Sequence, residues 1–158
     1  MKILGIDPGT ARLGWGVIDN EVMVDCGCLE TPPKQPEEKR LSSLFIKLNE
    51  LIKQHRPETA AVEKLFFFKN QTTLIPVAQS RGVVLLAAAQ NNLPVFSYTP
   101  LQIKQAVTGY GRAEKIQVQQ MVKSILKLKI IPRPDDAADA LAVALTHSFS
   151  YKFKSRVK

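Results

Sequence analysis

The N-terminal third of the chain decides the fold, because it alternates apolar runs with turn sequences: KILGID at residues 2–7, DPGT at 7–10 and LGWGV at 13–17. The first run ends on Asp7, and the second has the period of two that is typical of a strand. After a second turn at Asp19 and Asn20, a third strand is expected with four side chains on one face, Val22, Val24, Cys26 and Cys28. Such short connections predict an antiparallel meander of three strands.

From Glu37 onward the apolar residues recur with the period of amphipathic helices. Helices are expected from Glu37 to just before Pro57, over about 74–91, 99–107 and 113–128, and from Pro134 to about Phe149, with strands at 59–63 and 94–97. Pro76 is expected in the first turn of its helix, where a missing N–H does no harm. The pattern predicts an α/β fold: a mixed five-stranded sheet, three antiparallel strands and then parallel strands, flanked by helices.

Length and charge bound the function. The 158 residues predict a single domain over 1–150, followed by a basic C-terminal tail at 151–158 that is expected to be mobile. Lys and Arg number 22 against 14 Asp and Glu, which gives a net charge of +8. This charge favours a polyanionic partner, most commonly nucleic acid, although a basic protein without such a partner is the simpler alternative.

The cysteines and the apolar segments indicate the compartment. Cys26 and Cys28 are alternate residues on one strand, an arrangement that suits neither a disulfide nor a metal knuckle, so we expect reduced packing residues. Asp7 interrupts the first apolar run too early for a signal peptide, and no segment is expected to approach the length of a membrane span. A cytoplasmic protein with no membrane partner is therefore expected.

Four acidic residues are candidates for a shared site. Asp7 and Glu63 end apolar strands, and Asp136 and Asp139 lie three apart, on one face of a helix. Taken alone, Asp7 also fits a turn residue, and Asp135 or Asp136 fits an acid that stabilises a helix N-terminus. Glu63 and Asp139 are harder to explain in this way, because a carboxylate among apolar neighbours carries a desolvation cost.

The four carboxylates suit one kind of chemistry. Ligand sites in mixed sheets lie at strand ends near a change in strand order, where these residues are expected to converge. Three or four carboxylates around two ions form a two-metal hydrolytic site, and Mg²⁺ prefers such oxygen ligands. His55 and His147, the only histidines, are far apart in sequence, so a zinc cluster is not indicated. The pattern predicts a metal-dependent nuclease.

At these residues the chain resembles the RuvC family of bacterial Holliday junction resolvases, within the RNase H-like superfamily. The matching segments occur in family order and span nearly the whole chain: GIDPGT at 5–10, AVE at 61–63 with Phe66 and Lys69-Asn70, QSRGV at 79–83, GYGRAEK at 109–115 and DAADALA at 136–142. The DPGT turn alone is a weak signal, because sugar kinases and actin-like ATPases use something similar.

The resemblance implies a homodimeric endonuclease, dependent on Mg²⁺ or Mn²⁺ with two ions per site. It would nick two strands of like polarity at a four-way DNA junction, leave 5′-phosphate and 3′-hydroxyl ends, and work with the RuvA–RuvB branch-migration complex. The metal-binding and catalytic carboxylates would be Asp7, Glu63, Asp136 and Asp139. The residues that contact DNA would be Phe66, which stacks on an unpaired base, and Lys104, Lys115, Arg81 and Arg112.

Each of these assignments has a simpler alternative. At least one of residues 66–68, all phenylalanine, is expected to be a core residue, and the two lysines also fit solvent-exposed helix positions. The helix over 74–91 is the expected dimer interface, through an apolar stripe of Val77, Val84, Leu85 and Ala88.

Three other functions compete. A monomeric RNase H-type ribonuclease would share the carboxylates and the charge but cut an RNA–DNA hybrid. A non-catalytic DNA-binding module would leave four acids repelling its ligand. An actin-like ATPase needs a second lobe, which 158 residues do not supply.

Overall fold

The computed structural model describes residues 1–65 and 71–156. Its elements are β1 (Lys2–Pro8), β2 (Arg12–Asp19), β3 (Val22–Glu30), α1 (Glu37–His55), β4 (Thr59–Glu63), α2 (Gln71–Gln90), β5 (Val95–Tyr98), α3 (Pro100–Thr108), α4 (Lys115–Ile125) and α5 (Asp135–Arg156). The five strands form one sheet in the order β3-β2-β1-β4-β5. The predicted mixed sheet is confirmed, since β1, β2 and β3 pair antiparallel while β1, β4 and β5 pair in parallel.

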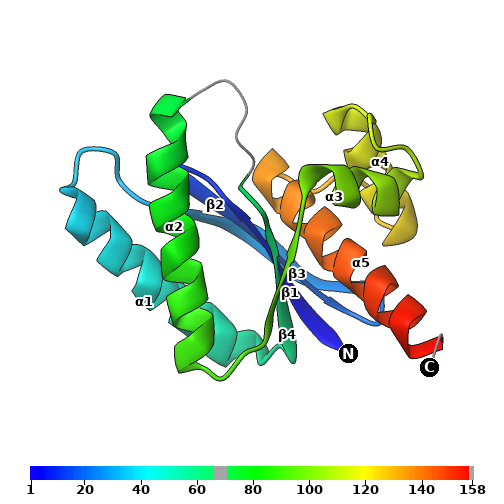
Figure 1. Cartoon of the computed structure of the whole chain (residues 1–158), viewed down its shortest axis with the longest axis horizontal. Coiled ribbons are helices and arrows are strands. Elements are labelled where there is room, and N and C mark those ends of the chain that lie inside the picture. Colours follow the sequence, from blue (N-terminus) through cyan, green and yellow to red (C-terminus); the bar gives the residue numbers. More distant parts are fainter. Residues whose placement is uncertain (66–70, 157–158) are drawn as a thin grey trace.

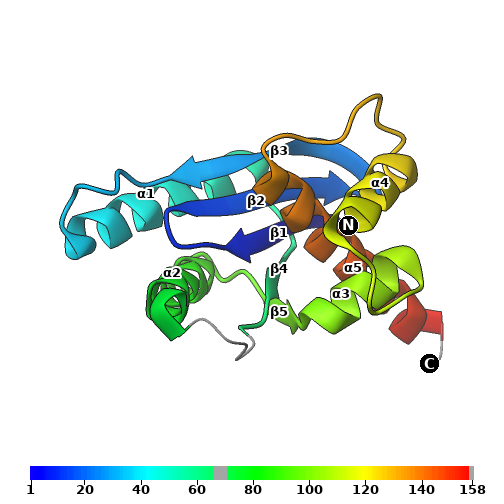
Figure 2. The ribbon, with the colours of Figure 1, turned by 90° about the horizontal axis from the view of Figure 1, so that it is seen from above.

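Helices cover both faces of the sheet (Figures 1 and 2). On one face α1 and α2 pack over a buried cluster that includes Leu4, Ile6 and Val62. On the other face α3, α4 and α5 pack over a second cluster that includes Ile3 and Leu141. Alternate residues of β1 therefore supply the two cores, as the period of a strand requires.

Two glycines let α5 lie directly on the sheet. A Cβ atom on Gly5 would overlap the carbonyl oxygen of Ala140, and one on Gly14 would overlap the carbonyl oxygen of Asp136. Any larger residue at these positions would push the helix away from β1 and β2. The close approach brings the first turns of α5 over the ends of the central strands.

The register of β3 differs from the predicted one. Its pairing with β2 shifts between Val17 and Ile18, which is the mark of a β-bulge. Met23 and Cys26, an odd number of residues apart, consequently pack against the same core cluster. The expected single face of Val22, Val24, Cys26 and Cys28 is therefore wrong at its start, where Val22 and Val24 are exposed.

Two helices extend beyond their predicted ends. The helix α2 begins at Gln71, so Pro76 lies inside it and not in its first turn. At that position Pro76 provides no N–H for the carbonyl of Thr72. The helix α5 continues to Arg156, well past the expected end near Phe149, because no Gly or Pro interrupts it and basic residues suit a helix C-terminus.

The helix α2 is also more apolar than expected. Its segment Thr72–Gln90 has 19 residues and a mean hydropathy of 1.3, which is enough by length and composition to cross a membrane. The prediction that no segment approaches that length is wrong on these two criteria. One such helix is weak evidence of a membrane span, and this one contributes Val84, Ala87 and Ala88 to the core beside α1.

Candidate active site

Two of the four predicted carboxylates lie side by side at the end of the sheet. Ile6 of β1 is paired in parallel with Val62 of β4, so the next residues along the two strands, Asp7 and Glu63, are neighbours. A hydrogen bond joins their side chains. The strand ends thus converge as the sequence predicts.

The neighbouring helices enclose this pair in a cavity of about 200 Å³. Asp139 of α5, Lys104 of α3 and Lys115 of α4 line it together with Asp7 and Glu63. The remaining wall is mostly apolar and consists of Pro100, Ile103, Val118, Ala142 and Val143. The cavity combines three carboxyl groups and two ammonium groups with a mostly apolar wall.

Burial strongly perturbs the acids. It raises the pKa of Asp7 to about 8, and the charge of Glu63 and the hydrogen bond between them act in the same direction. Burial also raises the pKa of Glu63, although the hydrogen bond from Asp7 opposes that shift. Burial and the neighbouring carboxylate thus favour the protonated form of Asp7, which can donate a hydrogen bond to Glu63.

The two lysines supply the positive charge of the cavity. The ammonium of Lys115 lies 2.7 Å from Oδ2 of Asp139. Burial raises the pKa of Asp139, while the hydrogen bond and charge of Lys115 oppose that rise. The charge of Lys104 favours the ionised form of Glu63. The pKa values of Asp7 and Asp139 are nevertheless raised, as expected of a cluster of carboxyl groups with few neighbouring cations.

The adjacent aspartates at the start of α5 have different surroundings. Asp135 forms an ion pair with Arg133. Asp136 does not line the cavity, but its charge raises the pKa of both Asp7 and Asp139. This arrangement agrees with Asp136 as the fourth member of the cluster and with Asp135 as a helix-terminus acid.

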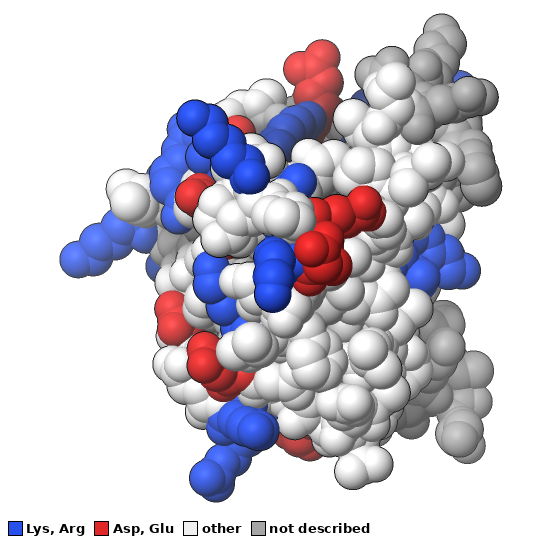
Figure 3. Space-filling model, turned by 90° about the vertical axis from the view of Figure 1, so that its left-hand side faces the viewer, with Lys and Arg blue, Asp and Glu red and all other residues white. Residues whose placement is uncertain are grey.

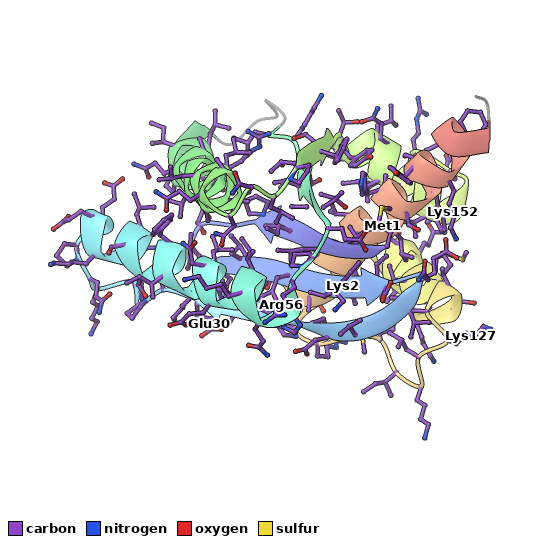
Figure 4. All side chains as sticks on the ribbon, turned by 90° about the horizontal axis from the view of Figure 1, so that it is seen from below. Met1, Lys2, Glu30, Arg56, Lys127 and Lys152 are labelled. Carbon is purple, nitrogen blue, oxygen red and sulfur yellow. The ribbon has the colours of Figure 1, made fainter. Side chains whose placement is uncertain are left out.

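The remaining predicted DNA contacts are not brought into the cavity. Arg81 of α2 donates to Oγ of Ser97 at 3.0 Å, on β5, and does not line the cavity. Arg112 is exposed between α3 and α4. Phe66 lies outside the described residues. Figure 4 labels basic residues that do not line the cavity, among them Lys2 at the start of β1, Arg56 after α1 and Lys152 on α5, so positive charge also lies elsewhere on the surface.

Sequence reasoning missed a residue that holds the turn after Asp7. Arg40 of α1 donates from Nη2 to the carbonyl oxygen of Thr10 at 2.9 Å and from Nε to Oγ1 of Thr31 at 3.2 Å. The side chain thereby ties the turn that follows Asp7 to α1. An arginine in the first turns of a helix is an ordinary surface pattern, so no sequence signal pointed to this role.

The donor set suits a hard divalent cation. All four acids offer oxygen, the ligand that Mg²⁺ prefers. Among the described residues, no group of three or more His, Cys, Asp or Glu side chains is already arranged to hold a metal ion. Burial and the neighbouring carboxylates raise the pKa of both Asp7 and Asp139, and a divalent cation would offset both effects, so the residues fit a cation at this place.

Comparisons with known proteins agree on one family. The family model described as crossover junction endodeoxyribonuclease RuvC matches residues 3–147. A crossover junction endodeoxyribonuclease RuvC of Pelotomaculum thermopropionicum is 54% identical over 162 residues, covering 100% of this chain and 99% of the relative.

Solved structures give the same result. A Thermus thermophilus RuvC structure matches with a TM-score of 0.91 and 38% identity, over 98% of this chain and 97% of that one. A second Thermus thermophilus RuvC structure, in complex with a Holliday junction substrate, has the same TM-score and identity and covers 98% and 96% of the two chains.

Proposed function

This chain belongs to the RuvC family of crossover junction endodeoxyribonucleases, and on that premise we propose that it resolves Holliday junctions by paired, symmetric nicks in strands of like polarity. The observation that carries the proposal is the cavity in which Asp7, Glu63 and Asp139 meet two lysines, on a chain of net charge +8. The relative with the same fold that was solved with a Holliday junction supports the choice of substrate. A role in DNA recombination and repair in the cytoplasm follows from that substrate.

The residues divide the chemistry between them. Asp7, Glu63, Asp136 and Asp139 would hold Mg²⁺, or Mn²⁺ in its place, as two ions. Held by these carboxylates, such ions would supply the Lewis-acid chemistry that makes a bound water nucleophilic and offsets negative charge on the leaving oxygen. Lys104 and Lys115 hold the scissile phosphate as point charges.

The cavity wall, the bond that is cleaved and the outer DNA contacts complete the proposal. The apolar wall lowers the local dielectric constant and so strengthens the electrostatic interactions in the cavity. Breaking the bond to the 3′ oxygen leaves the 5′-phosphate and 3′-hydroxyl ends. The exposed Arg112 extends the DNA contact beyond the cavity, and Phe66 stacks on an unpaired base of the junction. Arg81, which donates to Ser97 of β5, is the last of the basic residues that we assign to DNA contact.

The second part of the proposal is a homodimer formed through α2. Two members of the predicted stripe, Val84 and Ala88, are buried in the chain's own core, so that stripe is wrong for an interface. The apolar residues that α2 exposes follow a different line, namely Ile75, Ala78, Gly82, Leu86 and Ala89. Figure 3 shows a largely uncharged surface over α2, with most charges gathered on the side of α1.

This surface suits a second copy of the chain. Ile75 and Leu86 are 68% and 53% exposed, and exposed large apolar residues grouped on one helix face are typical of an interaction surface. A Cβ atom on Gly82 would meet open space, so the backbone there is accessible to a partner helix. A two-fold dimer matches the approximate two-fold symmetry of a four-way junction. The RuvA–RuvB complex would be a further partner of this dimer, by membership of the family.

The activity is tested with a synthetic four-way junction, a linear duplex and an RNA–DNA hybrid, each with and without Mg²⁺. Paired nicks in the junction alone, dependent on Mg²⁺, are the expected result. Asp7→Asn should abolish cleavage and leave junction binding intact or tighter, because it removes a carboxyl ligand and one ionisable acid. Cleavage of the hybrid in preference to the junction would instead support an RNase H-type ribonuclease.

The dimer is tested by light scattering, which should give a mass near twice 17.6 kDa. Leu86→Glu should yield a monomer and uncouple the two nicks. Ile46→Glu is the matched control, because Ile46 on α1 is 54% exposed and should leave the dimer intact. Concerted cutting by a protein that stays monomeric on the junction would contradict the interface.

A further inference from the structure

The cavity contains one direct ion pair, between Lys115 and Asp139. The ammonium Nζ lies 2.7 Å from Oδ2, and the two side chains are 57% and 25% exposed. Asp139 is one of the four proposed metal ligands, whereas Lys115 is a proposed DNA contact. One carboxylate group therefore faces two cations, the ammonium that it binds here and the metal ion that the proposed function assigns to it.

We propose that Lys115 is a displaceable counter-ion, which holds Asp139 in the metal-free protein and is released to a DNA phosphate when a divalent cation binds Asp139. This inference rests on the proposed function and deepens it, because it couples the binding of metal to the binding of DNA. Lys115 here is a positioning residue for the metal site, in addition to its contact with DNA.

The two partners differ in their freedom to move. Asp139 is anchored, because its neighbours Ala138 and Ala140 are fully buried where α5 lies on the sheet. Lys115 is the first residue of α4, and more than half of its side chain faces solvent. Its flexible four-carbon stem lets the ammonium swing away without movement of the helix. Displacement therefore moves Lys115 and leaves Asp139 in place.

The charges favour the exchange. A divalent cation brings two positive charges to a cluster that Lys115 serves with one. Once the cation is bound, it repels the nearby ammonium, while a phosphate at the mouth of the cavity attracts it. Metal binding thus improves phosphate binding, and by linkage DNA improves metal binding.

Lys104 provides an internal control. It lines the same cavity from α3 and influences Glu63 through its charge. Among the described residues, however, no ion pair joins Lys104 to a carboxylate. Lys104→Met therefore removes the same charge as Lys115→Met without freeing a ligand oxygen.

The first test is calorimetric titration of Mn²⁺ into the full chain without DNA. Lys115→Met should bind Mn²⁺ roughly three- to fivefold more tightly. This gain corresponds to the upper end of the free energies of partly exposed ion pairs, because the metal ion no longer has to break one. Lys115→Arg should bind Mn²⁺ more weakly than the unaltered chain, because a guanidinium grips a carboxylate with two hydrogen bonds. Opposite signs for Met and Arg are not expected of a merely structural residue. Lys104→Met should change the affinity less than Lys115→Met does.

Two results overturn the proposal in distinguishable ways. If the unaltered chain binds Mn²⁺ and Lys115→Met binds it with the same affinity, the displacement alone is overturned. The same holds if Lys104→Met tightens Mn²⁺ binding as much as Lys115→Met does. No Mn²⁺ binding by the unaltered chain overturns it together with the carboxylate–metal part of the proposed function.

The second test measures junction affinity by fluorescence anisotropy with and without Ca²⁺, which takes the same oxygen ligands. The gain in affinity on adding Ca²⁺ should be smaller in Lys115→Met than in Lys104→Met. An equal gain in the two variants overturns the transfer of Lys115 to the DNA.

Discussion

Replacing Asp7 by Asn should stabilise the metal-free protein at neutral pH while abolishing cleavage. Asp7 is a buried acid beside another carboxylate, and burial with that neighbour raises its pKa from 3.8 to about 8. The amide of Asn resembles the protonated acid and can still donate a hydrogen bond to Glu63. The substitution therefore keeps the favourable form of the side chain at every pH and removes the ligand needed for metal.

The sign of the effect follows from proton binding. Because the pKa of Asp7 is raised on folding, the folded chain binds a proton between about pH 4 and pH 8 that the unfolded chain releases. The contribution to stability is complete below pH 4 and is lost as the pH rises through about 8. The advantage of Asp7→Asn should accordingly be small at acid pH, grow with pH and level off above about 8.

The magnitude has a ceiling set by the same shift. A pH of 7 lies about three units above the pKa of Asp7 in the unfolded chain. Keeping this acid protonated in the folded chain therefore lowers the free energy of unfolding by at most about 4 kcal/mol. Relaxation of the cavity and sharing of the proton with Glu63 reduce this value, so we expect about 1–3 kcal/mol in favour of Asp7→Asn.

Urea unfolding in EDTA at pH 5, 6, 7 and 8 measures the difference. Asp25→Asn is the control for loss of a half-exposed carboxylate on β3, a group that also lies 3.5 Å from Nε2 of His55. Extra positive charge on a basic protein should destabilise that control slightly. The reasoning is refuted if Asp7→Asn is no more stable than the unaltered chain at pH 8, or if the gap does not widen from pH 5.

Three further predictions concern the start of α5 and the surface of α2. Asp136→Asn should abolish junction cleavage, whereas Asp135→Asn should cost only about 0.3–1 kcal/mol in urea unfolding; the reverse pattern would make Asp135 the ligand. Gly14→Ala should lower the cleavage rate and destabilise the chain by about 1–3 kcal/mol, because its Cβ overlaps the Asp136 carbonyl; full activity would contradict the close approach. In the monomeric Leu86→Glu background, Gly82→Ala should raise the free energy of unfolding by about 0.5–1 kcal/mol, and a loss of stability would mean that the site is not open.

Local patterns predicted most of the fold. The alternation in residues 13–17 and the apolar runs ending at Asp7 and Glu63 lie in strands of the observed sheet. The bulge in β3 was not predictable, because its register depends on pairing with β2 and not on its own sequence. The orientation of α2 was missed for a different reason. That helix is apolar on all sides, so periodicity does not distinguish the side that faces the core from the side that is exposed.

The part of the candidate site that depends on strand ends and on helix spacing was predictable from the sequence. Asp7 and Glu63 end neighbouring strands, and the spacing of Asp136 and Asp139 placed both near the start of α5. The ion pair of Lys115 with Asp139 was beyond sequence reasoning, because it depends on how the turn between α3 and α4 carries Lys115 back over α5. The tie between Arg40 and Thr10 is likewise a contact between elements distant in sequence.

The position of α2 relative to the cavity favours the proposed dimer. The helix packs beside α1 on one face of the sheet, whereas the cavity opens on the other face among α3, α4 and α5. A partner on the outward side of α2 therefore leaves the cavity open to DNA. Within the described residues each chain has one such cluster of acids, and paired nicks require two. Because the exposed apolar face of α2 also needs a covering partner, a second copy related by a two-fold axis satisfies both requirements.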